Sequence, residues 1–401
     1  MDSMVIIGAG ECGTRAAFAL REAGWTGPVT LIGAEPGLPY ERPPLSKPQG
    51  GAVQRQPICG ADALAQAGIR YLPGSVATAL EPDAARVRLG DGSGLGYHRL
   101  LIATGAQPRR LACPGAERAL DFRSHADAEA VFAGLTPGTP VAIIGAGLIG
   151  MEIAAVLTAQ NLPVTVIEAG PAPLARAVPP HFAARLTERH RAAGVALHFG
   201  ETIAGIDVRG IALTSGRRVA AGLVISAIGV MPDVALAQAA GLATGNGILT
   251  DARLQTSAPN VFAAGDCAAV AQPGGGHLRQ ESWRNARAQA ECAARNMLGA
   301  AQDFSALPWF WSDQYDLGLQ VAGRPEPGHA QVLRRQDGAE IGFYLDAGRL
   351  VAAAGLGPGN AVARDIKLAE MLIAAGARPD PALLADPAVG LKALLKTAQA
   401  A

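Results

Sequence analysis

Two short glycine-rich stretches are the part of this chain whose residue types and spacing could do chemistry. The first reads Gly8-Ala9-Gly10-Glu11-Cys12-Gly13, and the second reads Gly145-Ala146-Gly147-Leu148-Ile149-Gly150. In such a stretch the first glycine allows a tight turn, the second lets the backbone approach a pyrophosphate, and the third lets a helix pack against a strand. The amides at the start of that helix would then meet the negative charge. Each stretch is therefore a candidate dinucleotide-binding turn.

The elements that must position these turns are predicted on both sides of each one. A strand precedes the turn, and a helix and a second strand follow it. The expected strands are 4–7 with 29–32 and 141–144 with 164–167, and the expected helices are 14–23 and 151–160. An acidic residue ends each second strand, Glu35 at 22 residues after Gly13 and Glu168 at 18 residues after Gly150. This is close to the spacing of about 20 residues for an acid that binds a ribose.

The duplication predicts two bound dinucleotides. The two turns start at residues 8 and 145, which is too far apart for a short-period repeat protein. We expect FAD and NAD(H), because a flavin accepts a hydride, two electrons at once, and can release the electrons singly. A carboxylate at the ribose would repel a 2′-phosphate, so Glu168 favours NADH over NADPH. Arg176 is a candidate contact to a phosphate or to adenine.

Composition excludes several other classes of protein. The 401 residues carry 34 basic and 34 acidic side chains, so no overall basic field is available to hold nucleic acid. The 50 glycines and 28 prolines stay below the share that is typical of low-complexity sequence. An odd count of five cysteines, without metal-ligand spacing, predicts no metal site and a reducing, cytoplasmic location. Residues 141–159 are apolar, but three glycines and Glu152 favour a strand and a helix over a membrane span.

Further motifs make the chain resemble a known family. They are, in order, Tyr40-Glu41-Arg42-Pro43-Pro44-Leu45-Ser46-Lys47, Ala103-Thr104-Gly105, Ala264-Gly265-Asp266, Glu281-Ser282-Trp283 and Pro308-Trp309-Phe310-Trp311-Ser312-Asp313-Gln314. From residue 1 to about 360 the chain resembles the FAD-dependent, NADH-using ferredoxin reductases of bacterial oxygenase systems. These belong to the glutathione-reductase-like superfamily, with rubredoxin and putidaredoxin reductases and apoptosis-inducing factor.

The resemblance implies the fold and its domains. We expect an α/β fold with two Rossmann-like dinucleotide-binding domains and a C-terminal α+β domain. The FAD-binding domain would be discontinuous, over 1–107 and 223–306, with the NADH-binding domain over 108–222 inserted into it. Residues 307–401 would form the C-terminal domain, with the electron exit face and the ferredoxin docking surface. The last forty residues match no motif of the family.

The resemblance also implies which residues contact the cofactors. FAD would be contacted by Gly8, Gly10, Cys12, Gly13, Glu35, Arg42, Lys47, Val76, Thr104, Gly105, Arg123, Gly265, Asp266, Trp283 and Trp311. NADH would be lined by Gly145, Gly147, Ile149, Gly150, Glu152, Glu168 and Gly229. Leu148, inside the same turn, and Arg176 are further candidate contacts to NADH. Read from the residues alone, Cys12 also fits a small apolar residue packed in its turn, and Trp309 to Trp311 also fit a core.

Lys47 and Glu152 are the expected catalytic pair. The resemblance places them near flavin N5, where a cation stabilises negative charge on the reduced ring and a carboxylate holds that lysine in place. Without the resemblance, Lys47 would read as a solvated loop lysine. Glu152 would read as an acid that complements the dipole at the start of a helix.

No cysteine lies between Tyr40 and Lys47, where disulfide reductases of the superfamily carry CxxxxC and their oxidase and peroxidase relatives carry one cysteine. We therefore expect the electrons to leave the flavin directly, to a protein or to oxygen. The predicted reaction is hydride transfer from NADH to FAD, followed by single-electron transfers to a [2Fe-2S] ferredoxin. That ferredoxin, of the Rieske or adrenodoxin-like type, would feed an oxygenase.

Two other functions fit the same motifs. One is an NADH oxidase or quinone reductase, and the other is a redox-sensing flavoprotein of the apoptosis-inducing-factor type. A ferredoxin is usually acidic, so docking on a neutral chain would need a local basic patch. The candidates are Arg279, Arg284 and Arg287, or Arg334 and Arg335. We expect a monomer or a weak homodimer, with neither nucleic acid nor membrane as a partner.

Overall fold

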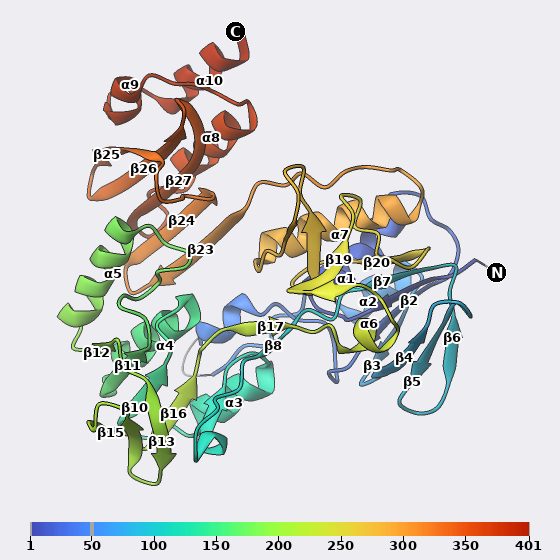
Figure 1. Cartoon of the computed structure of the whole chain (residues 1–401), viewed down its shortest axis with the longest axis horizontal. Coiled ribbons are helices and arrows are strands. Elements are labelled where there is room, and N and C mark those ends of the chain that lie inside the picture. Colours follow the sequence, from blue (N-terminus) through green and yellow to red (C-terminus); the bar gives the residue numbers. More distant parts are fainter. Residues whose placement is uncertain (1, 49–51, 401) are drawn as a thin grey trace. The chain divides into compact units, whose positions relative to one another are not determined.

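The computed structural model describes residues 2–48 and 52–400 and divides the chain into two compact units (Figure 1). Unit 1 comprises Met1–Leu45, Gln54–Gln107 and Val230–Ala306. Unit 2 comprises Ser46–Val53, Pro108–Gly229 and Leu307–Ala401. Each unit contains a parallel sheet, and unit 2 also contains a C-terminal antiparallel sheet. The predicted α/β fold class is confirmed.

Unit 1 is built on a five-stranded parallel sheet with the order β20-β7-β1-β2-β3. Its strands are β1 (Met4–Ile7), β2 (Val29–Gly33), β3 (Ile69–Pro73), β7 (Arg99–Ile102) and β20 (Val261–Ala263). Every residue of β1 is buried, because alternate side chains enter two different cores. Met4 and Ile6 pack in one core, while Val5 and Ile7 pack in the other. A central parallel strand that is covered on both faces reads as an unbroken apolar run.

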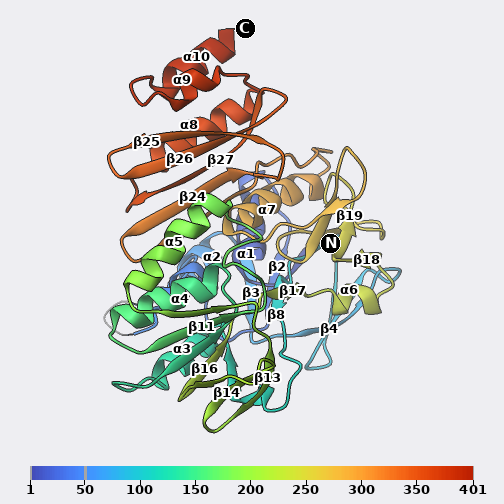
Figure 2. The ribbon, with the colours of Figure 1, turned by 60° about the vertical axis from the view of Figure 1, so that its left-hand side comes forward.

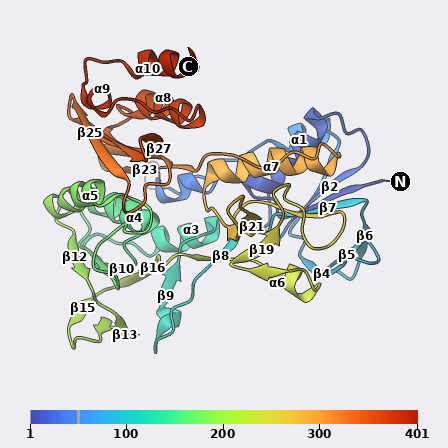
Figure 3. The same cartoon turned by 45° about the horizontal axis from the view of Figure 1, so that its top comes forward.

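Two helices cover one face of this sheet. α1 (Glu11–Glu22) and α7 (Trp283–Met297) lie side by side, as Figure 3 shows. Their buried faces are rich in alanine, so the two helix backbones can approach closely. The other face is covered in part by the antiparallel strands β4 (Ala77–Glu81), β5 (Arg86–Leu89) and β6 (Gly94–Gly96).

The remaining elements of unit 1 are short. They are the 3-10 helix η1 (Pro43–Ser46) at its edge, α2 (Ala61–Gln66), α6 (Ala235–Ala239), β18 (Thr244–Gly245), β19 (Gly247–Thr250), β21 (Ala268–Ala271) and β22 (His277–Leu278). Strands β18, β19, β21 and β22 form a small sheet. The turn that follows β20 and leads into this sheet contains Gly265 and Asp266.

Unit 2 repeats the same design with a parallel sheet of order β12-β11-β10-β16-β9. Its strands are β9 (Ala119–Asp121), β10 (Val141–Ile144), β11 (Val164–Glu168), β12 (Ala196–Phe199) and β16 (Leu223–Ser226). The helices are α3 (His125–Ala133), α4 (Leu148–Ala159) and α5 (Pro180–Ala192), with 3-10 helix η2 (Ala116–Arg118). Strands β13 (Ile203–Asp207), β14 (Gly210–Leu213) and β15 (Arg218–Ala220) form an antiparallel sheet.

The boundary between the parallel sheets differs from the predicted one. We expected the first domain to resume at residue 223, but β16 pairs with β10 of unit 2 in parallel register. The unit boundary lies after Gly229 instead. The boundaries at residues 107 and 229 fall at β8 (Ala106–Pro108) and β17 (Val230–Pro232), which pair as a two-stranded sheet. An apolar strand does not by itself reveal which of two similar sheets it completes.

The C-terminal part of unit 2 is an antiparallel sheet with helices on one face (Figure 2). Its order is β23-β24-β27-β26-β25, formed by β23 (Trp309–Gln314), β24 (Leu317–Gly323), β25 (Ala330–Gln336), β26 (Ala339–Asp346) and β27 (Arg349–Pro358). Helix α8 (Ala363–Ala374) packs on β24 and β27, α9 (Pro381–Ala385) on β25, and α10 (Leu391–Ala400) on α8. The last forty residues, which matched no motif, therefore complete this core.

The helices after the glycine turns begin earlier than predicted. α1 starts at Glu11 and α4 at Leu148, three residues before the expected positions. The reason is that the second glycine of each stretch is the N-cap, so the third glycine already lies inside the helix. The apolar residues 141–159 form β10 and α4. Within the described residues, no helix is long and apolar enough to cross a membrane.

Glu340 of β26 connects α5 to the C-terminal sheet inside unit 2. His181 Nε2 and Arg185 Nη1 each lie 2.8 Å from its Oε2, and Arg335 donates to its Oε1. Burial raises the pKa of Glu340, but the hydrogen bonds from Arg335, His181 and Arg185 outweigh burial and bring the pKa down to about 2. The ionised carboxylate therefore stabilises the folded state.

We predict that Glu340→Gln lowers the stability of the protein by about 2 kcal/mol at pH 7. Because the folded pKa lies below the unfolded value of about 4.3, this stabilisation is present at neutral pH and is lost as the pH falls towards 2. Urea unfolding midpoints at pH 7, 5 and 3 check it, with the largest difference from wild type at pH 7. Glu326→Gln is the control, since Glu326 is exposed and its ion pair with Arg324, at 3.8 Å, lies at the surface. A pH-independent loss would contradict this explanation.

Candidate cofactor and electron-transfer site

The first glycine turn is held by close contacts between backbone atoms. A Cβ on Gly8, whose φ is +105°, would lie 2.1 Å from the carbonyl oxygen of Ala103. A Cβ on Gly13 would lie 1.8 Å from the carbonyl oxygen of Gly8. Both distances are far inside van der Waals contact, so only glycine fits at either position. The second turn repeats this, with 2.4 Å from Gly145 to Ala227 O and 2.1 Å from Gly150 to Gly145 O.

The second glycine of each turn has a different environment. Positions for a Cβ on Gly10 and on Gly147 have no other atom of the described chain within 4 Å. These two glycines are the N-caps of α1 and α4, and within the described residues neither helix has a side-chain cap. The helix N-terminus therefore faces open space along bare backbone, which fits the approach of a dinucleotide pyrophosphate.

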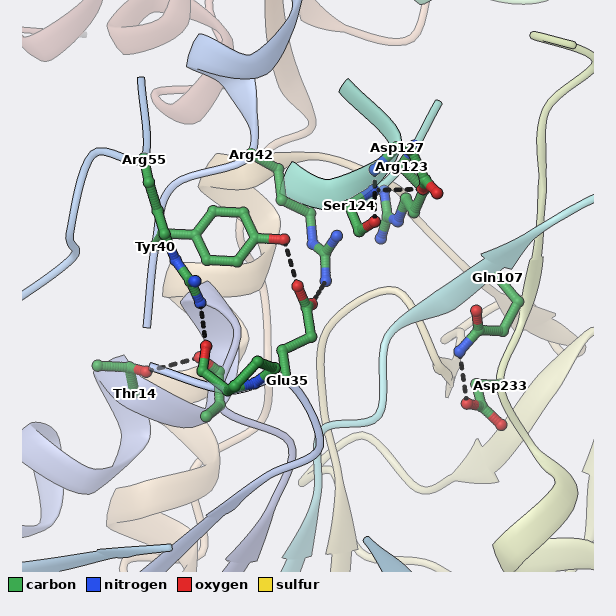
Figure 4. A network of polar contacts seen from close by, with 12 residues as sticks. Thr14, Glu35, Tyr40, Arg42, Arg55, Gln107, Arg123, Ser124, Asp127 and Asp233 are labelled. Carbon is green, nitrogen blue, oxygen red and sulfur yellow. Dashed lines mark hydrogen bonds and ion pairs between the residues drawn. The ribbon is translucent and has the colours of Figure 1, made fainter. Parts of the chain in front are cut away.

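Glu35, the predicted ribose acid of unit 1, follows β2 and has two partners (Figure 4). The Tyr40 hydroxyl donates to its Oε2 at 2.5 Å, and Arg42 Nη2 donates to its Oε1 at 2.9 Å. Arg42 and Arg55 also lie near the Tyr40 ring, 5.6 and 4.8 Å from its centroid. The Tyr40-to-Lys47 motif thus brings Arg42 directly to the predicted ribose acid. Tyr40 and Arg55 are candidate site residues that the sequence did not single out.

Glu168, the predicted ribose acid of unit 2, is bound to the glycine turn itself. The amide of Ala146, inside the turn, donates to its Oε2 at 2.8 Å, and the amide of Gly170 donates to its Oε1 at 2.8 Å. Each carboxylate oxygen can accept more than one hydrogen bond, so the group can still receive ribose hydroxyls. Both amides act only as donors, so they orient an ionised carboxylate at the second turn.

The side chains of two arginines lie next to Gly229, which is predicted to line the NADH site. Its φ is +94°, and a Cβ there would lie 3.2 Å from Arg176 Nη2 and 3.8 Å from Arg109 Nε. The backbone amide of Arg109 also donates to Gly229 O at 2.9 Å. The structure therefore places Arg176 beside Gly229 and adds Arg109, which no motif indicated. A Cβ at Gly229 would crowd these guanidinium groups.

Several other predicted FAD contacts lie in loops at the ends of unit 1 strands. Thr104 Oγ1 donates to the carbonyl oxygen of Asp233 at 2.7 Å, and the amide of Asp233 donates to Gly105 O at 2.9 Å. A Cβ on Gly265 would lie 3.0 Å from Cys12 Cβ. Burial raises the pKa of the Cys12 thiol well above its ordinary value. Cys12 therefore packs as a small buried residue against Gly265.

The remaining predicted residues are placed as follows. Val76 is half exposed between β3 and β4, Asp266 follows Gly265, and Trp283 begins α7 beneath the guanidinium of Arg287 at 5.0 Å. Leu148 and the exposed Ile149 open α4. Arg123 lies in unit 2, where its backbone amide donates to Asp127 Oδ2 at the start of α3 (Figure 4). The predicted FAD contact Arg123 thus belongs to unit 2.

The predicted catalytic pair, Lys47 and Glu152, meets inside unit 2. Glu152 lies on α4 and is 9% exposed. Its Oε2 accepts a hydrogen bond from Ser46 Oγ at 2.7 Å, and its Oε1 accepts one from Ser312 Oγ at 2.6 Å. Lys47 forms an ion pair with Asp313. The adjacent residues Ser46 and Lys47 thus meet the adjacent residues Ser312 and Asp313, around Glu152.

Trp311 belongs to the same cluster. Its ring stacks on Trp309, with centroids 5.5 Å apart and planes 29° apart, and Lys47 Nζ lies 5.7 Å from its centroid. We name Ser46, Lys47, Glu152, Trp311, Ser312 and Asp313 the lysine–glutamate cluster. Sequence reasoning missed Ser46, Ser312 and Asp313 as site residues, although all three stand beside predicted ones inside the quoted motifs.

Opposing effects act on the Glu152 carboxyl. Burial raises its pKa, while the charge of Lys47 and the hydrogen bonds from Ser312 and Ser46 lower it. Burial dominates, so the pKa is raised above its ordinary value. A buried acid with a raised pKa beside a cation can gain or lose a proton nearer neutral pH than a surface glutamate can.

Comparisons with known proteins identify the family. Residues 2–290 match the pyridine nucleotide-disulphide oxidoreductase family and residues 309–395 match the reductase C-terminal family, so the chain belongs to the pyridine nucleotide-disulphide oxidoreductases. The ferredoxin–NAD(+) reductase component of the anthranilate 1,2-dioxygenase system of Burkholderia cepacia is 41% identical over 98% of this chain and 99% of that protein. The predicted likeness to ferredoxin reductases is confirmed. The C-terminal match covers most of the forty residues that carried no motif.

Solved structures agree with this relationship. The ferredoxin reductase for the CYP199A2 system of Rhodopseudomonas palustris has a TM-score of 0.93 and 32% identity, covering 98% of this chain and 99% of that one. Putidaredoxin reductase in its covalent complex with putidaredoxin has a TM-score of 0.91 and 32% identity, covering 100% and 99%. The chain is therefore an oxidoreductase related along its whole length to ferredoxin reductases.

We predict that two alanine substitutions in the first turn separate folding from cofactor binding. Gly13→Ala forces a Cβ into the carbonyl of Gly8 and should lower stability by about 2 kcal/mol or more, with loss of flavin as a consequence. Gly10→Ala meets no protein atom within the described chain and should change the stability of the apoprotein by less than about 0.5 kcal/mol, yet reduce bound flavin. Urea unfolding of the apoprotein and the flavin-to-protein absorbance ratio check both. Full flavin content in Gly10→Ala would contradict the assignment of this turn.

Proposed function

We propose that this protein takes a hydride from NADH onto FAD and passes the electrons singly to a [2Fe-2S] ferredoxin that feeds a Rieske dioxygenase or a haem monooxygenase. The observation that carries the proposal is the pair of strand–turn–helix units, each with open space at its second glycine and an acid at the following strand. The relatives supply the acceptor, since they include reductases named for ferredoxins of dioxygenase and putidaredoxin systems.

The two cofactors have different protein partners in this proposal. In unit 1, the turn from Gly8 to Gly13 would hold the FAD pyrophosphate, with Glu35 at its ribose. In unit 2, the turn from Gly145 to Gly150 would hold NADH, with Glu168 at its ribose. FAD, when bound, supplies the chemistry that converts a two-electron donor into single-electron steps. The protein supplies position and charge.

Lys47 and Glu152 would tune the reaction. Lys47 provides a positive charge, and its ion pair with Asp313 fixes where that charge stands. Glu152 provides a buried carboxylate that is oriented by two serine hydroxyls. We infer that this cluster faces the reacting ends of the cofactors, as the family likeness implies. Trp311, stacked on Trp309 and next to Lys47, would border the face through which electrons leave.

The structure narrows the choice of a basic docking patch. Arg334 is only 3% exposed and donates to the carbonyl oxygens of Leu384 and Leu383, so it was wrongly considered as a surface cation. The side chain of Arg279 is 7% exposed and pairs with Glu281. The side chain of Arg335 is 67% exposed and is paired with Glu340. Arg287, 43% exposed near the start of α7, lies 3.7 Å from Glu11, and Arg284 is on the same helix. We propose that an acidic ferredoxin docks at this end of α7.

The location of the protein is also proposed. We infer a cytoplasmic location from the five cysteines, because all of them are free thiols in the structure and a reducing compartment keeps thiols in that state.

Acceptor specificity separates the proposal from its alternatives. Purified protein with bound flavin should be bleached by NADH and should reduce cytochrome c slowly until a [2Fe-2S] ferredoxin is added. Rapid oxygen or quinone consumption without ferredoxin would instead identify an NADH oxidase or a quinone reductase. A long-lived charge-transfer absorbance with negligible turnover towards every acceptor would identify a redox sensor. Steady-state rates with each acceptor decide among the three.

We predict that Glu168→Ala raises the KM for NADH at least tenfold and leaves FAD bound, because it removes the ribose acceptor from unit 2 alone. Glu188→Ala, at an exposed position of α5, is the matched control and should behave as wild type. The measurements are initial rates against NADH and NADPH and the flavin absorbance of the purified variants. Loss of flavin from Glu168→Ala would mean that the two dinucleotide sites were assigned the wrong way round.

A further inference from the structure

A row of buried polar side chains continues from Glu152 away from Lys47. Gln314 Nε2 lies 3.1 Å from Ser312 Oγ, and His190 Nε2 lies 2.9 Å from Gln314 Oε1. The Tyr315 hydroxyl lies 3.1 Å from His190 Nδ1. Ser312 and His190 have no exposed surface, and Gln314 is 1% exposed. The row crosses from α4 through β23 to α5, and the proposed function makes no use of His190 or Gln314.

The chemistry of these groups gives the row a direction. An amide nitrogen can only donate, so Ser312 Oγ accepts from Gln314 and its own proton is left for Glu152. The same orientation of the amide turns Gln314 Oε1 towards His190 Nε2, and a carbonyl oxygen can only accept. His190 therefore carries its proton on Nε2, and Nδ1 accepts from Tyr315. Every donor in the row points towards the Glu152 carboxylate, which such a chain stabilises cooperatively.

The opposite direction also satisfies every member of the row, when Glu152 is protonated on Oε1, the oxygen that faces Ser312. The hydroxyl of Glu152 then donates to Ser312, and Ser312 donates to a Gln314 amide rotated by half a turn. The amide nitrogen of Gln314 then donates to His190 Nε2, so the imidazole proton must be on Nδ1, facing Tyr315. A mixed arrangement would leave a buried donor facing a donor, or an acceptor facing an acceptor, and that is costly at buried positions.

The charged groups around the row do not set this direction by themselves. Glu152 faces Lys47 and Asp313. His190 faces Arg189 from its own helix and the Tyr315 ring, whose centroid is 4.9 Å away, while Arg189 is paired with Asp316 at 2.8 Å. Burial lowers the pKa of His190, so the imidazole stays neutral near pH 7. A neutral imidazole has two tautomers, with its proton on Nδ1 or on Nε2, so His190 can adopt either of the two directions of the row.

We propose that Glu152, Ser312, Gln314 and His190 form one coupled switch. In this switch, ionised Glu152 holds His190 in the Nε2–H tautomer, and protonation of Glu152 on Oε1 reverses the row and moves the imidazole proton to Nδ1. The net change is one proton taken from solvent onto the carboxylate, since the imidazole keeps a single proton throughout. His190 and Gln314 are thereby positioning residues for Glu152. This deepens the proposed function, because the switch sets the charge state of the carboxylate that we place beside the cofactors.

The test is the tautomer of His190 in the purified holoprotein as the pH is varied. Long-range ¹H–¹⁵N correlation of ¹⁵N-histidine-labelled protein distinguishes the two tautomers, and only seven histidines contribute signals. His190→Gln identifies the His190 signal by its loss. We expect Nε2–H at the alkaline end, and conversion to Nδ1–H over the pH range in which infrared spectroscopy detects protonation of a carboxyl that Glu152→Gln removes.

Two serine variants form a matched pair. Ser312→Ala cuts the row, so the His190 tautomer should no longer change when Glu152 is protonated. Ser46→Ala removes the other donor to Glu152 but leaves the row intact, so the conversion should persist and move upward by about one pH unit. A single tautomer in wild type across the titration of Glu152, an imidazolium in place of the tautomer change, or a persistent change in Ser312→Ala would overturn the proposal.

The pH dependence of flavin reduction by NADH distinguishes a positioning role of His190 from a purely structural packing role. His190→Phe should shift the pH profile of flavin reduction by NADH upward by about half a unit, and His190→Gln, which can donate to Gln314, should restore it. An identical shift in both variants would contradict the positioning role. These readouts do not involve ferredoxin. A protein that fails to reduce any ferredoxin would refute the proposed function, yet leave the tautomer result standing.

Discussion

The structure of unit 2 depends on the cost of burying the Glu152 carboxylate. A carboxylate removed from water needs donors, and the donors here come from Ser46 and Ser312, which are 106 and 160 residues away along the chain. This requirement explains why Ser46 and Lys47 belong to unit 2 although Leu45, directly before them, belongs to unit 1. It also fixes β23 against α4, because Ser312 can reach Glu152 only from that strand. Lys47 and Asp313 are placed as neighbours of the two serines.

The two dinucleotide turns follow a second constraint, which is close approach between backbones. In each turn the first and third glycines face carbonyl oxygens that leave no room for a Cβ, while the second faces open space. The close contacts of the first and third glycines hold the strand and the helix together. The open space at the second glycine leaves the helix N-terminus accessible. Stability and binding are therefore divided among glycines that look alike in the sequence. The acids differ as well, since Glu35 is held by side chains and Glu168 by backbone amides.

Local patterns predicted the elements that depend on local physics. Strands 4–7 and 141–144 have the predicted bounds, because buried central strands are unbroken apolar runs between glycines. The helix starts were wrong by three residues, since a glycine N-cap carries no side-chain signal. The predicted domain boundary after residue 222 was wrong, because the sheet to which β16 belongs is set by its pairing with β10, a strand that is distant in the sequence. Ser46, Ser312, Asp313 and the row to His190 could not be found, because hydrogen bonds between segments over a hundred residues apart leave no periodicity. The burial of Arg334 could not be predicted either, because it depends on hydrogen bonds to Leu383 and Leu384, about fifty residues away.

We propose that electrons enter this protein in pairs and leave it singly towards a ferredoxin. In an anaerobic titration, one equivalent of NADH is added to the holoprotein, followed by increasing amounts of an oxidised [2Fe-2S] ferredoxin, and the absorbance of both chromophores is recorded. We expect two equivalents of ferredoxin to be reduced for each NADH, with complete return of the flavin absorbance. A flavin that remains bleached in the presence of excess ferredoxin, and recovers only when oxygen is admitted, would contradict the account.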